Sequence, residues 1–243
     1  MIEKSDELLY VFFQSLNSEE RKDIGLMGGW AVHYTLKNNG VEHMGSRDID
    51  IFFDPTKITL RSVEEKLRRM GFHPHSTFRW ARYFDSETER ELSLIETKTH
   101  PFHFTSIIYV DIATPIKMEH VMPEPLLKKV FEKERAYIQI NDIQIMVPSS
   151  KILIQMKLKS TPERRDSFKR TKDIADLYAL LNSDPRSWLI ENGHRIRTKG
   201  LNKKAVQKFK EKLERFTIDG TISNASTMLK TDPNKVIDLL QKL

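Results

Sequence analysis

The sequence Asp-Ile-Asp-Ile-Phe-Phe at residues 48–53 constrains the fold of this chain more than any other feature. Side chains alternate between the two faces of a β-strand, so Asp48 and Asp50 would share one face and the apolar residues the other. A strand anchored by its apolar face can present two carboxylates together, and such oxygens suit a hard divalent cation. The segment therefore predicts a strand that carries a metal site.

A glycine pair, Gly28 and Gly29, lies upstream of these acids. It follows the short apolar run Ile24–Met27, which predicts a strand that ends in a tight turn. Residues 30–37 then have the composition of a helix, which ends near Gly40. Glycine lets the backbone approach a bulky group such as a triphosphate, so the turn is a candidate phosphate site.

A third carboxylate, Asp111, lies within the strongly apolar segment 105–113, which predicts another strand. A carboxylate on a central apolar strand is costly unless it is paired or metal-bound. We therefore expect Asp48, Asp50 and Asp111 to converge and to hold one or two Mg²⁺ ions, with Mn²⁺ as an alternative ion.

The order of the predicted elements divides the chain near Pro148-Ser149-Ser150. Before this point strands and helices are mixed, which predicts an α+β domain at residues 1–148, with a mixed sheet flanked by helices. After it we expect only helices, in a second domain at residues 149–243. The predicted helices of the first part are 8–13, 30–37 and 59–70, its strands 24–27, 48–53, 80–84, 92–95 and 105–113, with a strand or hairpin at 138–147; the helices of the second are 151–159, 169–182, 186–192, 202–215 and 233–242.

Composition excludes several classes of protein. The 243 residues include no cysteine, which excludes disulfides and thiolate metal sites. No run of about 18 apolar residues is present, so we expect no membrane span. The first residues lack a signal-peptide pattern, and a cytoplasmic protein is expected.

Charge is distributed unevenly along the chain. Residues 1–150 carry 19 Lys and Arg against 23 Asp and Glu, a net charge of −4, whereas residues 151–215 carry 18 against 8, a net charge of +10. A basic second part attached to an acidic first part indicates an anionic partner such as nucleic acid. Solvated helix faces explain the same excess equally well.

Three short motifs together resemble the polymerase β-like nucleotidyltransferase superfamily. They are Met-Gly-Gly-Trp-Ala-Val at 27–32, Arg-Asp-Ile-Asp-Ile at 47–51 and Val-Asp-Ile at 110–112. The resemblance implies that Gly28, Gly29 and the following helix bind the triphosphate, although Gly29 stands where many members have serine. It also implies that the first two acids hold Mg²⁺ and that the third helps to activate the attacking hydroxyl.

A second resemblance covers the start of the helical part. Pro-Ser-Ser-Lys-Ile-Leu at 148–153, Lys-Leu-Lys at 157–159 and Lys-Asp-Ile-Ala-Asp-Leu at 172–177 are similar to the abortive-infection toxin-like nucleotidyltransferases, and less closely to the minimal nucleotidyltransferases of toxin–antitoxin pairs. The resemblance implies that Lys157 and Asp173 support nucleotide binding and catalysis. Lys157 could instead be a solvated helix lysine, and Asp173 could cap a helix or pair locally.

These resemblances imply an enzyme that moves NMP from an NTP to an acceptor hydroxyl. The acceptor could be RNA, a protein or a small molecule, with tRNA as the first candidate, and an antitoxin would be a protein partner. Arg47 could neutralise phosphate charge or form a structural ion pair. The alternatives are a non-catalytic nucleotide- or partner-binding member of the same fold, and a sugar-nucleotide transferase, which can also use an Asp-x-Asp pair.

Overall fold

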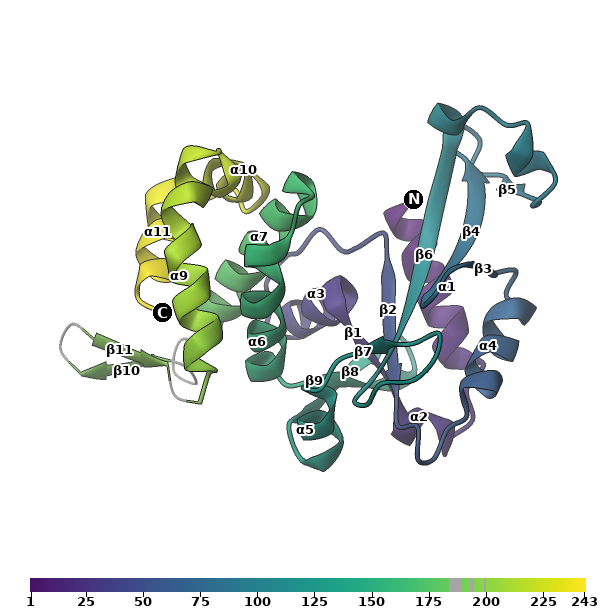
Figure 1. Cartoon of the computed structure of the whole chain (residues 1–243), viewed down its shortest axis with the longest axis horizontal. Coiled ribbons are helices and arrows are strands. Elements are labelled where there is room, and N and C mark those ends of the chain that lie inside the picture. Colours follow the sequence, from purple (N-terminus) through teal and green to yellow (C-terminus); the bar gives the residue numbers. More distant parts are fainter. Residues whose placement is uncertain (184–188, 193–194, 199) are drawn as a thin grey trace. The chain divides into compact units, whose positions relative to one another are not determined.

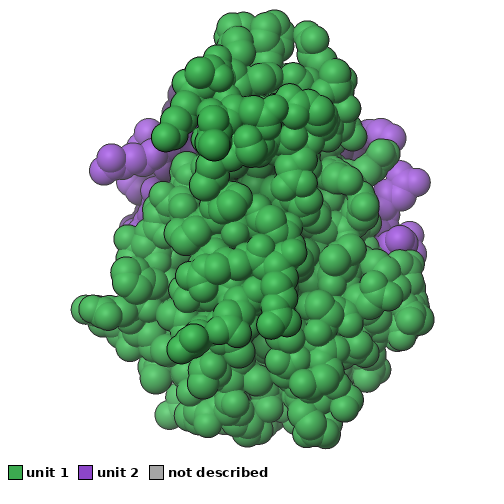
Figure 2. Space-filling view, turned by 90° about the vertical axis from the view of Figure 1, so that its right-hand side faces the viewer, with its two compact units in different colours: residues 1–34, 44–148 green, residues 35–43, 149–243 purple. Residues whose placement is uncertain are grey.

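The computed structural model describes residues 1–183, 189–192, 195–198 and 200–243, and its internal contacts divide between two units. Unit 1 comprises residues 1–34 and 44–148, and unit 2 comprises residues 35–43 and 149–243. Figure 2 colours the two units separately and shows one face of unit 1, in green. In the described part of the chain, no helix combines the length and the apolar composition that crossing a membrane requires.

A mixed β-sheet forms the centre of unit 1 (Figure 1). The β2–β6 and β1–β9 pairs are parallel, whereas β1–β2, β3–β4, β4–β6 and β8–β9 are antiparallel. The predicted class, a mixed sheet flanked by helices, is therefore confirmed. The strands, in their order across the sheet, are β3 (His73–Ser76), β4 (Arg79–Asp85), β6 (Thr105–Thr114), β2 (Ile49–Phe53), β1 (Ile24–Met27), β9 (Ile143–Pro148) and β8 (Arg135–Ile140), with β5 (Glu91–Leu92) beside β4 and β7 (Met122–Pro123) beside β6.

The central strands are buried on both faces beyond the acidic residues. Ile49 and Ile51 are buried as expected, but Phe52, on the same face as Asp50, is also fully buried. Strands covered on both faces are typical of parallel pairing, as between β2 and β6. The predicted hairpin around Asn141 is formed by β8 and β9, with Asn141 at φ +52°.

Helices α3 and α4 begin and end within two residues of the predicted positions, whereas α1 begins six residues before the predicted start and the sequence did not predict α2 or α5. In α4, Thr59 caps the N-terminus by accepting a hydrogen bond from the amide of Ser62, and Gly71 follows the C-terminus at φ +80°. α1 buries an apolar stripe that includes Leu9 and Phe13. The helices are α1 (Ile2–Gln14), α2 (Glu20–Asp23), α3 (Gly28–Asn38, whose residues from Thr35 belong to unit 2), α4 (Leu60–Arg69) and α5 (Leu127–Glu132).

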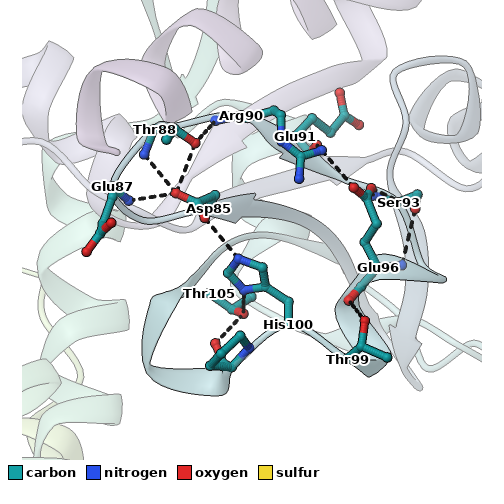
Figure 3. A network of polar contacts seen from close by, with 11 residues as sticks. Asp85, Glu87, Thr88, Arg90, Glu91, Ser93, Glu96, Thr99, His100 and Thr105 are labelled. Atoms are coloured by element: carbon teal, nitrogen blue, oxygen red, sulfur yellow. Dashed lines mark hydrogen bonds and ion pairs between the residues drawn. The ribbon is translucent and has the colours of Figure 1, made fainter.

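The connection from β4 to β6 is held by polar contacts of its own (Figure 3). The Asp85 carboxylate accepts hydrogen bonds from the Thr88 amide and hydroxyl and lies 2.9 Å from His100 Nε2. The strand predicted at 92–95 ends at Leu92, and the short helices η1 (Glu96–Lys98) and η2 (Phe102–Phe104) follow. The strand prediction was wrong after Leu92 because the Ser93 amide and hydroxyl bind the Glu96 carboxylate and start a turn.

Unit 2 is mainly helical. Its helices are α6 (Ser150–Ser160), η3 (Thr161–Glu163), α7 (Ser167–Ser183), α9 (Lys203–Ile218), α10 (Thr221–Met228) and α11 (Pro233–Gln241). The sequence did not predict α10, nor that residues 35–43 belong to this unit.

The helix predicted at 186–192 was wrong where the structure describes it. Residues 186–188 lie outside the described part, and β10 (Leu189–Asn192) pairs antiparallel with β11 (Arg195–Thr198). A short apolar run such as Leu189-Ile190 cannot be assigned to helix or strand from periodicity alone. The second part of the chain therefore contains a two-stranded sheet in addition to its helices.

Candidate active site

Asp50 and Asp111 are neighbours across the sheet. They are register partners on the parallel strands β2 and β6, and Arg79 of β4 is the register partner of Asp111 on its other side. Met27, the last residue of β1, is the partner of Asp50. Residues opposite one another on adjacent strands place their side chains on the same face. The four residues therefore form a row across β4, β6, β2 and β1, strands that lie side by side in Figure 1.

Asp48 lies immediately before β2 and is separated from Asp50 by the buried Ile49. The chain here is fixed by Ser5 of α1, whose hydroxyl donates a 2.8 Å hydrogen bond to the carbonyl of Arg47 and accepts one from Trp30 Nε1. Ser5 is completely buried, so these contacts are shielded from water. The Arg47 side chain is exposed. Helix α1 thus positions the segment that carries the first predicted acid, a role that the sequence did not suggest.

Gly28 lies directly against Asp50. Its φ of +67° belongs to the left-handed region, which glycine adopts far more readily than other residues. A Cβ atom on Gly28 would lie 2.0 Å from Asp50 Oδ2, so a side chain could fit at this position only if Asp50 moved. Gly28 begins α3 directly after β1, and Gly29 is its second residue. The predicted glycine turn, the start of a helix and one of the predicted acids are therefore adjacent.

Arg79 binds both carboxylate oxygens of Asp111. Its Nε is 2.7 Å from Oδ1 and its Nη2 is 2.6 Å from Oδ2, and its guanidinium lies 4.5 Å from the centre of the Tyr109 ring. The hydrogen bonds to Asp111 raise the pKa of Arg79 above its ordinary value, and the charges of Asp111, Asp48 and Asp50 add to this effect. Sequence reasoning missed Arg79. The available signal was that a buried carboxylate such as Asp111 requires a cation.

The donor set fits a divalent cation in part. Asp48 and Asp50 supply the oxygen ligands that Mg²⁺ and Mn²⁺ prefer, and the Asp50 carboxylate occupies the space that a Cβ atom on Gly28 would fill. Asp111, however, has both of its oxygens bound by Arg79. Among the residues that the structure describes, no three His, Cys, Asp or Glu side chains are grouped as metal ligands. The side chains thus fit an ion held by Asp48 and Asp50, with Asp111 paired to Arg79.

Lys157 and Asp173 lie in unit 2, where they belong to a buried ionic network. Lys157 Nζ is 2.6 Å from Asp173 Oδ1 and 2.5 Å from Asp176 Oδ2. His43 Nε2 is 2.7 Å from the other oxygen of Asp176, and Arg164 Nε is 3.0 Å from Asp173 Oδ2. Lys157 is therefore not a solvated lysine, and Asp173 does pair locally. The sequence motif contained Asp176, but nothing in the sequence indicated its pairing with His43.

Ionic attraction overcomes the cost of burial in this network. Burial disfavours the charge of Lys157, but the carboxylates of Asp173 and Asp176 raise its pKa above the ordinary value. Burial likewise opposes ionisation of Asp176, yet the charge of Lys157 and the hydrogen bond from His43 lower its pKa. Both residues are therefore charged at neutral pH, and the charge of each stabilises the charged form of the other.

Comparisons with known proteins place this geometry in context. No curated protein sequence matches the chain. Two similar solved structures are an antigenic nucleotidyltransferase-like protein from Paracoccidioides brasiliensis, with 17% identity, 89% of this chain and 95% of that chain covered and a TM-score of 0.44, and the antibiotic-resistance factor ANT(2'')-Ia, with 14% identity, 90% and 96% covered and a TM-score of 0.45. Similarity at these levels does not indicate which substrate this chain uses.

A family model matches residues 39–232, well over half of the chain. Its description is nucleotidyl transferase AbiEii toxin of a type IV toxin–antitoxin system. The match includes the acids at 48, 50 and 111 and the network around Lys157, and it begins after the glycine pair. The chain therefore belongs to the AbiEii family of nucleotidyl transferase toxins, as its resemblance to the abortive-infection toxin-like nucleotidyltransferases predicts.

Proposed function

We propose that this protein transfers NMP from an NTP to an acceptor hydroxyl with the help of Mg²⁺, for which Mn²⁺ can substitute. The observation that carries this proposal is the register pairing of Asp50 with Asp111 next to Gly28. It places two carboxylates of neighbouring strands on one face, beside the start of a helix. In the reaction the acceptor oxygen forms a bond to the α-phosphorus, and the bond from that phosphorus to pyrophosphate breaks.

The roles of the residues follow from their chemistry. Gly28, Gly29 and the first turn of α3 offer backbone N–H groups and the positive end of a helix dipole to the triphosphate. Asp48 and Asp50 would hold the divalent ion. When bound, the ion supplies positive charge to the phosphate oxygens as pyrophosphate leaves. Asp111 is proposed either as a ligand of a second ion or as the acceptor of the hydroxyl proton.

Three further residues are proposed to assist nucleotide binding. The Arg47 side chain is exposed directly before Asp48, where it could contact phosphate. Lys157 and Asp173 are included because of the family resemblance. They are also a buried ion pair, and burying two charges is energetically tolerable only when they are well paired. Because both residues are buried, we propose that Lys157 holds neighbouring groups in position and does not act as a solvent-exposed cation.

The proposed acceptor is nucleic acid, with tRNA as the first candidate. Residues 151–215 carry the net charge of +10, and α9 contributes the exposed Lys203, Lys204, Lys208 and Lys210. Such a surface attracts a polyanion by releasing its counterions. A protein hydroxyl and a small alcohol are the other acceptors to be tested. Because the family belongs to type IV toxin–antitoxin systems, we also propose that an antitoxin counteracts the protein.

A non-catalytic nucleotide-binding protein is the second candidate function. The pairing of both Asp111 oxygens with Arg79 favours it, because the guanidinium stabilises the ionised carboxylate and makes it a weaker base. The presence of all three acids favours catalysis. The two functions differ in whether any acceptor becomes labelled.

A labelling experiment tests the proposal. The protein is incubated with Mg²⁺, each of the four NTPs labelled at the α-phosphate, and separate pools of tRNA, other RNA, protein and small alcohols. We expect label on one acceptor class with an α-phosphate label and none with a γ-phosphate label, since the latter leaves with pyrophosphate. Tight nucleotide binding without labelling of any pool would favour the non-catalytic function.

A further inference from the structure

Arg79 is held in place by three independent features. Strand register puts it opposite Asp111, its Nε and Nη2 bind the two Asp111 oxygens, and its guanidinium lies over the Tyr109 ring. Tyr109 precedes Asp111 by two residues on β6 and so lies on the same face of the sheet. A bidentate guanidinium fixed by register and stacking is a preorganised cation and not a mobile surface charge.

Arg79 competes directly with a metal ion for Asp111. A divalent ion on Asp111 would need at least one of the two oxygens that the guanidinium now binds. It would also lie within a few ångströms of a permanent positive charge, and that repulsion is large in a half-buried site. Arg79 and an ion bound to Asp111 therefore exclude each other as long as the guanidinium keeps its present position.

We propose that Arg79 occupies the position at Asp111 that a second divalent ion would otherwise take. The protein would then hold a single divalent ion, on Asp48 and Asp50, while Arg79 supplies the second positive charge. Arg79 acts through Asp111 and is a positioning residue. This inference rests on the proposed metal-dependent function, and of the two roles proposed for Asp111 it excludes that of ligand to a second ion.

The chain contains a matched arginine for comparison. Arg82, three residues along the same strand, binds the carboxylate of Glu91 on β5 with Nε and Nη2, and its guanidinium lies 5.6 Å from the Phe84 ring centre. It therefore repeats the bidentate pair and the aromatic contact of Arg79 in the same sheet. Arg82 is not part of the row of Asp50 and Asp111. Replacing it removes a second bidentate arginine–carboxylate pair, whose carboxylate is more exposed than Asp111, while leaving the acids unchanged.

Mn²⁺ titration followed by electron paramagnetic resonance tests the proposal without measuring activity. The full-length wild type, Arg79→Gln, Arg82→Gln and the double variant Arg79→Gln/Asp111→Asn are compared, and thermal melting verifies that each is folded. We expect one Mn²⁺ per chain in the wild type and in Arg82→Gln. In Arg79→Gln we expect a second ion whose dissociation constant falls by about tenfold or more, because one positive charge has been removed from its vicinity. The double variant should return to one ion.

Each other result has a definite meaning. Two ions per chain in the wild type, or one ion in Arg79→Gln, would overturn the assignment of Arg79 and leave the proposed transferase function intact. An equal increase in bound Mn²⁺ in Arg79→Gln and Arg82→Gln would overturn it as well, since the effect would then come from the loss of a positive charge in general. Absence of Mn²⁺ binding in all four proteins would overturn the metal-dependent function itself.

Discussion

The α-carbon of Gly28 faces the carboxylate of Asp50 so closely that a Cβ atom there would lie 2.0 Å from Oδ2. The hydrogen atoms on the α-carbon of Gly28 fit against the Asp50 carboxylate, whereas a methyl group there would overlap with it. This contact links the two motifs that the sequence separates, the glycine pair and the acidic strand. It also makes the position of Asp50 sensitive to a single added carbon.

Gly28→Ala should displace the Asp50 carboxylate and reduce metal binding and transfer by roughly 100-fold or more, because a small misplacement of a reacting group has large kinetic consequences. The matched control is Gly40→Ala. Gly40 has a φ of +73°, similar to that of Gly28, but a Cβ atom there would meet nothing within 4 Å. Both variants should lose about 1 kcal/mol of unfolding free energy from backbone strain. Similar activities of the two variants would show that contact with Asp50 is unimportant.

Lys157→Met should destabilise unit 2 by about 3–5 kcal/mol, because it leaves the buried carboxylates of Asp173 and Asp176 without their shared cation. Urea denaturation followed by circular dichroism measures this loss. Lys159→Met, two residues along α6 and exposed to solvent, is the control and should change the unfolding free energy by less than about 0.5 kcal/mol. Equal effects of the two substitutions would mean that the network contributes nothing specific to stability.

Acid should loosen the connection between β4 and β6 progressively as the pH falls from about 4.5 to about 2. The Ser93 amide, then the Ser93 hydroxyl and Arg90, lower the pKa of Glu96 from its ordinary 4.5 to about 2 (Figure 3). A carboxyl group whose pKa is lowered in the folded state contributes its full stabilisation of the fold above its unfolded pKa. For Glu96 this contribution is lost as the pH falls from about 4.5 to about 2. We expect the NMR signal of the Glu96 carboxyl carbon to titrate near pH 2. In Glu96→Gln the hydrogen-exchange protection factor of the Ser93 amide should not change across this pH range. A titration midpoint near pH 4.5 for Glu96 in the wild type would contradict the prediction.

The strands that carry the acids could be predicted because local pattern determines them. Strand β2 alternates between acids and apolar residues at its start, and β6 is apolar enough that Asp111 stands out as a residue in need of a partner. Gly28 was recognisable because an apolar strand runs directly into it. The division of the chain into domains at 1–148 and 149–243 came from the same patterns, and whether each segment folds independently stays a proposal.

The partners of these residues could not be predicted because long-range register determines them. Arg79 meets Asp111 across 32 residues of sequence, through the antiparallel pairing of β4 with β6. His43 meets Asp176 across 133 residues. The sequence contains 40 lysines and arginines, and their local patterns do not indicate which of them neutralises a given carboxylate. The pairing of β10 with β11 was missed for a different reason, because the short apolar run of β10 fits a helix and a strand equally well.

The most direct test of the account compares label transfer from α-phosphate-labelled NTP by the wild type, Asp50→Asn and Asp54→Asn, using the acceptor found in the labelling screen. Asp54 follows β2 and accepts a hydrogen bond from the Thr56 amide, which an asparagine oxygen can also accept. We predict that Asp50→Asn lowers the transfer rate by at least about 1,000-fold while its melting temperature stays close to that of the wild type. Asp54→Asn should retain wild-type transfer within about twofold. A folded Asp50→Asn protein that transfers label at a rate near that of the wild type would contradict the assignment of Asp50 as a ligand of the catalytic ion.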